Sequence, residues 1–115
     1  MFAYEIPGLR FSLPAGGAVA RNRFVAVNDA KAVQSTAATK IVGVSMNEVT
    51  AEELNKNERI VEIATGIVMV EAGGAVTSGA AVGADAEGKA VASDTGIGVA
   101  ITAAGGAGEL IAVKL

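Results

Sequence analysis

The chain has 115 residues, a formal net charge of −3, and neither histidine nor cysteine. It therefore cannot form a Ser-His-Asp triad, a cysteine nucleophile, a histidine- or cysteine-ligated zinc site or a disulfide. The length fits one domain, and an apolar fraction of 51% with only 3% aromatic residues and 15 glycines indicates a core of small side chains. Such a core releases little free energy per residue, so further burial in an oligomer or against a partner is expected.

The first segment, residues 1–14, contains both prolines and three of the four aromatic side chains. It lacks a basic region followed by an apolar run, so it does not resemble a signal peptide. No stretch of the chain is apolar for long enough to span a membrane. We expect residues 1–14 to form an extended N-terminal arm and residues 15–115 to form a single β domain.

An internal repeat begins after this arm. The sequence Ala-Gly-Gly-Ala-Val at residues 15–19 recurs at residues 72–76, which is 57 positions later, and the residues that follow stay roughly in step. We interpret this as a drifted duplication of about 57 residues, with halves 15–71 and 72–115. Chance similarity in a chain so rich in alanine, glycine and valine is the alternative.

Most of the remaining chain has the pattern of short strands rather than helices. Runs of six to eight residues rich in valine and isoleucine end at Gly, Asn, Asp or Ser; they are residues 23–28, 40–45, 58–64, 66–71, 96–103 and 109–115. Thr65-Gly66 fits a hairpin turn between two of them. Thr50 and Glu53 have capping-box spacing, which predicts one short helix near residues 50–57. The fold class predicted is all-β, a small sandwich or barrel made of two repeats.

Two motif-like strings do not indicate chemistry. Residues 83–89 match the spacing of a phosphate-binding loop up to its lysine, but Ala90 stands where Ser or Thr would bind magnesium. Asp85, Glu87 and Asp94 lack the ordered ligand spacing of a calcium loop. The cations are scattered and are not interleaved with aromatic residues, so nucleic-acid binding is not expected. We predict no enzyme activity, no cofactor and no metal site.

A third group of residues resembles a known family. Ala72 to Gly79, Val82, Gly98 to Ala100 and Ala107 to Glu109 are similar to a signature of the small capsid cement proteins of tailed bacteriophages. The resemblance covers roughly residues 15–115. It implies a β-rich head decoration protein, often a homotrimer, that is made in the cytoplasm of the host bacterium and binds the outer capsid surface of the virion. There it would staple adjacent copies of the major capsid protein.

The arm is the expected contact with the capsid. An extended segment can add as a strand to an exposed sheet edge, and large side chains and arginine are frequent at binding hot spots. The predicted contact residues are Phe2, Tyr4, Ile6, Arg10 and Phe11. The alternative is that these aromatic side chains cover the core of the domain itself. The alternative function is a virion- or surface-associated β module that binds a carbohydrate or a receptor.

Overall fold

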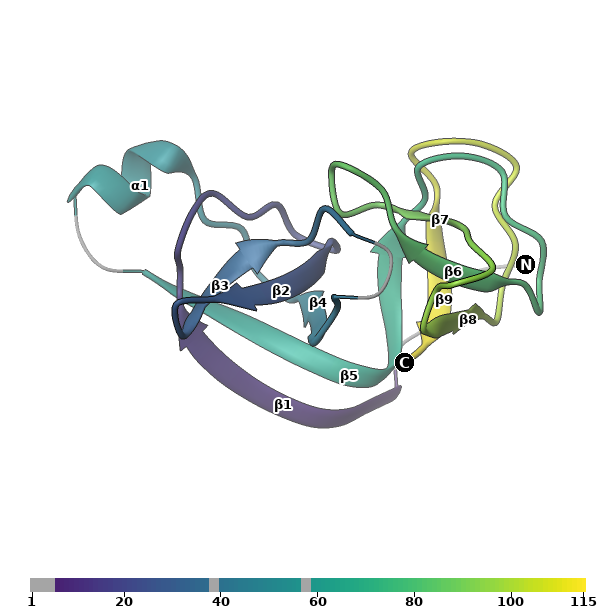
Figure 1. The fold of residues 1–115 in the computed structure, drawn as a ribbon, viewed down its shortest axis with the longest axis horizontal. Coiled ribbons are helices and arrows are strands. Elements are labelled where there is room, and N and C mark those ends of the chain that lie inside the picture. Colours follow the sequence, from purple (N-terminus) through teal and green to yellow (C-terminus); the bar gives the residue numbers. More distant parts are fainter. Residues whose placement is uncertain (1–5, 38–39, 57–58) are drawn as a thin grey trace.

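The computed structural model describes residues 6–37, 40–56 and 59–115. The described chain is mostly β, as predicted, and the predicted short helix is also present (Figure 1). In chain order the elements are β1 (Ile6–Pro14), β2 (Phe24–Asn28), β3 (Lys31–Gln34), β4 (Gly43–Ser45), α1 (Ala51–Lys56), β5 (Ile60–Glu71), β6 (Ala81–Ala84), β7 (Ala90–Ala92), β8 (Gly98–Ala100) and β9 (Leu110–Lys114).

The strands form one antiparallel sheet in the order β3-β2-β4-β5-β9-β8-β6-β7, and β1 pairs with β5 off this path. The sheet curls into a half-barrel. The long strand β5 lies at its centre. Its first part pairs with β4 and β1, and its second part pairs with β9. Figure 1 shows β5 running along most of the molecule and then bending towards β9.

The strand pairing repeats in register. Phe11 pairs with Ile63, and Val68 pairs with Val113. The first member of the second pair lies 57 residues after the first member of the first pair, and the second member lies 50 residues after its counterpart. The same two offsets relate the pairs at residues 14 and 60 to those at residues 71 and 110. We define unit A as β1 to β4 together with residues 60–64 of β5. Unit B consists of residues 66–71 of β5 together with β6 to β9.

Each unit curls until the end of its first strand meets another of its own strands. Ala15, directly after β1, forms a parallel bridge with Ala32 in β3. Ala72, directly after β5, forms the matching parallel bridge with Ala90 in β7. Each five-stranded unit is therefore a small curled layer with an enclosed inner face.

The pairing moves the boundaries of the two repeats. Unit A includes β1, which we expected to lie outside the repeat as an arm, and residues 66–71 belong to unit B rather than to the first half. The extended conformation expected for this segment is present over residues 6–14, but the strand pairs with β5 of the same chain. The sequence did not reveal the match because β1 and residues 66–71 share only an alternation of apolar positions.

The predicted hairpin turn at Thr65-Gly66 is wrong. Gly66 has the positive φ that was expected, 94°, but β5 continues through it without reversing. The strand continues because β1 pairs with it on both sides of Thr65, at Ala64 and at Gly66, and β9 pairs with it from Ile67 onward. Opposite this point β1 has a bulge, where the N–H of Leu9 donates to Thr65 Oγ1 at 3.2 Å. The glycine thus permits a bend between the units.

Two apolar clusters form the core. The first fills the inner face of unit A and comprises Val19, Val25, Ala32, Val49, Val61 and Ile63, with Phe11, Leu13, Ala15 and Leu54 packed against it. The second fills the inner face of unit B and also contains Phe24, Val44 and Ala64 from unit A. These three residues are paired side by side across β2, β4 and β5, so they lie on the outer face of unit A. The outer face of one unit therefore covers the inner face of the other.

The helix α1 closes one end of unit A. The N–H of Glu53 donates to Thr50 Oγ1 at 3.2 Å, and Glu53 Oε1 accepts the N–H of Thr50 at 3.2 Å, which is the capping box predicted from the sequence. The hydrogen bond from the Thr50 N–H, followed by the one that Thr50 Oγ1 donates to Glu53 Oε1 at 3.1 Å, lowers the pKa of the Glu53 carboxyl from its usual 4.5. The cap fixes the start of the helix, and Leu54 packs against the core of unit A.

Candidate functional site

The structure describes three of the five predicted contact residues. Phe2 and Tyr4 lie outside the described residues, and Ile6 begins β1 opposite Ile67. Arg10 and Phe11 are neighbours in β1, and a strand directs successive side chains to opposite faces. Arg10 is exposed on the outer face, whereas Phe11 packs against the core cluster of unit A.

The outer surface beside Arg10 combines charge with exposed apolar groups. Arg10 Nη2 lies 3.9 Å from Glu62 Oε2, and both side chains are more than half exposed. Leu9 in β1 and Ile60 at the start of β5 are the most exposed large apolar side chains of the described chain, at 63% and 59%. A shallow depression of about 320 Å³ lies between the two strands and is lined by Arg10, Phe11, Ser12, Glu62 and Ile63. We call this surface the β1–β5 face.

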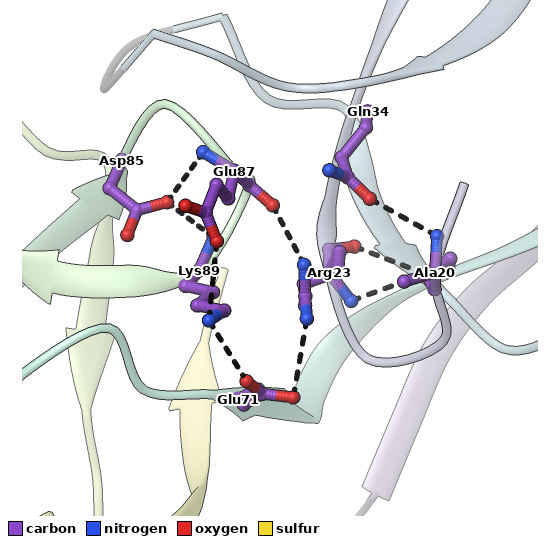
Figure 2. Close-up of polar contacts among 8 residues, drawn as sticks. Ala20, Arg23, Gln34, Glu71, Asp85, Glu87 and Lys89 are labelled. Carbon is purple, nitrogen blue, oxygen red and sulfur yellow. Dashed lines mark hydrogen bonds and ion pairs between the residues drawn. The ribbon is translucent and has the colours of Figure 1, made fainter. Parts of the chain in front are cut away.

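A second group of polar residues lies where the two units meet (Figure 2). Arg23 of unit A contacts Glu71 at 3.4 Å and donates to the carbonyl of Glu87 at 3.1 Å. Lys89 lies between two carboxylates, 3.3 Å from Glu87 and 3.4 Å from Glu71. The hydrogen bond to Glu87, followed by that to Glu71, raises the pKa of the Lys89 ammonium above its usual 10.5.

Main-chain contacts reinforce this junction. The N–H of Phe24 donates to the carbonyl of Gly88 at 2.8 Å, and the N–H of Glu71 donates to the carbonyl of Asn22 at 3.0 Å. Gly88 has a φ of 75°, and a Cβ there would lie 3.1 Å from the Phe24 oxygen. Asp85 orders the same turn by accepting the N–H groups of residues 87 and 89. Every charged group in the junction has an internal partner, which indicates a structural brace rather than a reactive site.

The charged side chains of the β1–β5 face are more exposed than Arg23, Glu71 and Lys89 of the junction. Over residues 6–37, 40–56 and 59–115, no three His, Cys, Asp or Glu side chains come together in a way that could hold a metal ion. In the same part of the chain, no helix is long and apolar enough to cross a membrane. The exposed apolar and charged side chains of the β1–β5 face are suited to contact with another macromolecule.

Comparison with known proteins decides the family. The family model of the phage cement proteins matches residues 5–115. The chain belongs to the phage cement protein family. The match includes the whole of β1 and both units, and it places this cement protein among the structural proteins of the phage head. No curated protein sequence gives a significant match.

A solved structure shares the fold of this cement protein. The N base of the head fiber gp8.5 of bacteriophage phi29 superposes with a TM-score of 0.71, over 91% of this chain and 92% of that one. The two sequences are 20% identical, so the likeness concerns the fold.

Sequence reasoning missed several surface and junction residues of this cement protein. Leu9 and Ile60 were not singled out, although both are large apolar residues beside charged ones. Phe24 was also missed, although it is the one aromatic residue outside the first 14. The alternation of apolar and polar residues along β1 was the available signal, because it already places Arg10 and Phe11 on opposite faces.

Proposed function

We propose that this cement protein is a decoration protein that binds the outer surface of the mature head and staples adjacent copies of the major capsid protein. The family membership supports a role at the phage head. The observation that carries the proposed contact is the β1–β5 face, where Leu9 and Ile60 are largely exposed and Arg10 lies on the outer side of β1. Large apolar side chains and arginine dominate the energy of many protein interfaces.

The residues of the predicted arm take different roles in this proposal. Arg10 contacts the capsid directly, and Phe11 supports the strand from the inner face. Phe2, Tyr4 and Ile6 are proposed as further contacts, because they supply large side chains just before the exposed part of β1. A homotrimer, implied by the family resemblance, is part of the same proposal.

Stapling requires that the two ends of the protein keep a fixed separation. The junction of Arg23, Glu71, Glu87 and Lys89, together with the unbroken strand β5, joins units A and B without a linker. Contacts made by the two units would therefore be held at a constant distance, which supports a bridging role.

The described chain does not favour the alternative of a carbohydrate-binding module. Such a module usually presents an exposed aromatic platform to its ligand. Of the two aromatic residues within the described ranges, Phe24 is fully buried and Phe11 packs against the core.

Co-sedimentation with purified phage heads tests the proposed function. We expect the protein to pellet with expanded heads and not with procapsids. Arg10→Glu should weaken capsid binding by about tenfold or more, because it reverses a contact charge at a cost of about 1.4 kcal/mol or more. Lys40→Glu is the matched control, since Lys40 is an exposed cation of unit A outside the β1–β5 face. Removal of residues 1–5 tests Phe2 and Tyr4 while leaving β1 in place.

The assay can refute the proposal in two ways. If the protein does not bind expanded heads at all, the decoration role is wrong. If Arg10→Glu and Leu9→Asp bind as tightly as the wild type, the capsid contact lies elsewhere.

A further inference from the structure

A cavity in unit A lies apart from the β1–β5 face. Its volume is about 340 Å³, which is at the lower end of the range for ligand-binding pockets. Its walls are the segments 18–20 and 48–50, which the bridge between Val19 and Val49 holds together. The side chains of Arg23 and Gln34 complete the lining. We call this space the unit A cavity.

Unit B shows which parts of this lining the fold itself requires. The pair of Phe24 with Val44 is equivalent to the pair of Ala81 with Val99, and the pairing of β2 with β3 is repeated by β6 with β7. The bridge of Val76 with Ala104 repeats that of Val19 with Val49. These registers place an alanine of unit B at the position of each long polar side chain of the cavity: Ala80 for Arg23, Ala92 for Gln34 and Ala103 for Glu48. The strand pairing of a unit therefore forms without these polar groups.

The junction between the units accounts for one of the three polar residues. Arg23 contacts the Glu71 carboxylate at 3.4 Å and donates to the carbonyl of Glu87 at 3.1 Å, so its charge is balanced inside the chain. Glu48 has no such role. It is exposed, and it takes part in none of the ion pairs formed within residues 6–37, 40–56 and 59–115. The wall of the unit A cavity thus carries one negative charge that is not balanced.

Gln34 adds a second oxygen acceptor to the cavity. Its Oε1 accepts the N–H of Ala20 at 3.1 Å, which holds the side-chain amide beside segment 18–20 (Figure 2). An amide oxygen has two lone pairs, so it can accept one more hydrogen bond. The cavity therefore combines a carboxylate and an amide oxygen with walls of alanine and valine.

We propose that the unit A cavity binds the side chain of a lysine in a peptide segment of a partner protein. An ammonium group has three N–H donors and no acceptor, which suits a site with two oxygen acceptors. The four-carbon stem of lysine can pack along apolar walls while its charged end stays at the wet rim beside Glu48. Glu48 would repel a carboxylate or phosphate ligand, and none of the described residues in the lining is aromatic, so a sugar has no ring to stack on.

The arrangement favours lysine over arginine. A guanidinium binds best as a planar fork to a single carboxylate, whereas an ammonium is a compact charge that can donate to separate acceptors. The proposal concerns a soluble peptide and the free chain, so it stands or falls independently of capsid binding.

An NMR titration of the labelled full chain with N-acetyl-lysine methylamide tests the proposal. We expect saturable shifts of the Gln34 side-chain amide and of the backbone amides of Ala18 and Ala20. The equivalent amides of unit B, at Ala75 and Thr77, should not move. N-acetyl-norleucine methylamide is the matched probe, because it keeps the stem and lacks the ammonium, and it should bind at least about tenfold more weakly. Binding of the lysine probe should also weaken as sodium chloride is added.

Two variants locate the binding groups. Glu48→Gln removes the charge and keeps the shape, and Gln34→Ala introduces the residue that unit B has at the equivalent position. Each should weaken binding of the lysine probe by about tenfold or more. Glu52→Gln is the matched control, because Glu52 is an exposed acid of α1 outside the cavity lining, and it should bind as the wild type does. Thermal unfolding shows whether each variant is folded, and Glu48→Gln alone suffices if Gln34→Ala does not fold.

Three results would overturn the proposal. The first is the absence of a saturable shift at the cavity up to the solubility limit of the lysine probe. The second is equal affinity for the lysine and norleucine probes, and the third is unchanged affinity of Glu48→Gln.

Discussion

Replacing Phe24 by alanine tests the junction between the two units. Phe24 belongs to β2 of unit A, yet its side chain is fully buried in the cluster that fills unit B. Truncation of a buried phenylalanine to alanine costs about 3–5 kcal/mol, because burial is lost and a cavity remains. For a chain of 115 residues with an unfolding entropy of about 2.1 cal/mol/K per residue, this corresponds to a fall in Tm of about 12–20 °C.

Chemical denaturation and native-state hydrogen exchange measure this effect. The free energy of unfolding should fall by the amount above, and Phe24→Leu should cost less than about 1.5 kcal/mol because it leaves a smaller cavity. Backbone amides of β9 in unit B should lose protection together with those of β2. A loss below about 1 kcal/mol, or faster exchange confined to unit A, would refute the idea that Phe24 fills the core of unit B.

Four further substitutions test local features. Gly96→Ala should destabilise the protein by more than about 2 kcal/mol, because a Cβ there would overlap the Val82 carbonyl; an unchanged denaturation midpoint would contradict this. Ala30→Gly should stabilise it by about 0.5–1 kcal/mol, because Ala30 has a φ of 58°, and any loss of stability would count against the assigned turn. Thr50→Ala should cost about 1 kcal/mol through the lost helix cap. The ionised Glu53 carboxyl, whose pKa is lowered, stabilises the fold above pH 4.5, and this stabilisation is lost as the pH falls through the folded-state pKa. Denaturation curves of Glu53→Gln recorded below pH 4.5 should therefore show less sensitivity to acid than those of the wild type. An identical acid profile would contradict the cap.

Local patterns predicted the elements of the fold well. The β class followed from short valine- and isoleucine-rich runs, and the helix at residues 51–56 followed from the Thr50–Glu53 capping box. These features depend on neighbours in the sequence, so they can be read without knowing the tertiary structure. The repeated Ala-Gly-Gly-Ala-Val likewise marked the duplication that the strand register displays.

The long-range features could not be predicted in the same way. The sequence of β1 has almost nothing in common with residues 66–71, so only the pairing in the sheet reveals that they are equivalent. Gly66 signals a positive φ, but a hairpin and a bent continuous strand use the same glycine, and the partners on either side decide between them. The contrast between buried Val44 and exposed Val99 depends on which unit covers the other, which no local pattern encodes.

The continuous strand β5 also has a mechanical consequence. A force that pulls unit A away from unit B finds no slack segment to extend, since β5 runs through both units and each of its residues except Thr65 is paired with β1 or β9. Tension is carried by the backbone of this strand, by the hydrogen bonds that it makes with β1, β4 and β9, and by the contacts of Arg23 and Phe24 with unit B. The protein should therefore yield under load only when strand pairs separate together, and not by the gradual lengthening that a flexible linker allows.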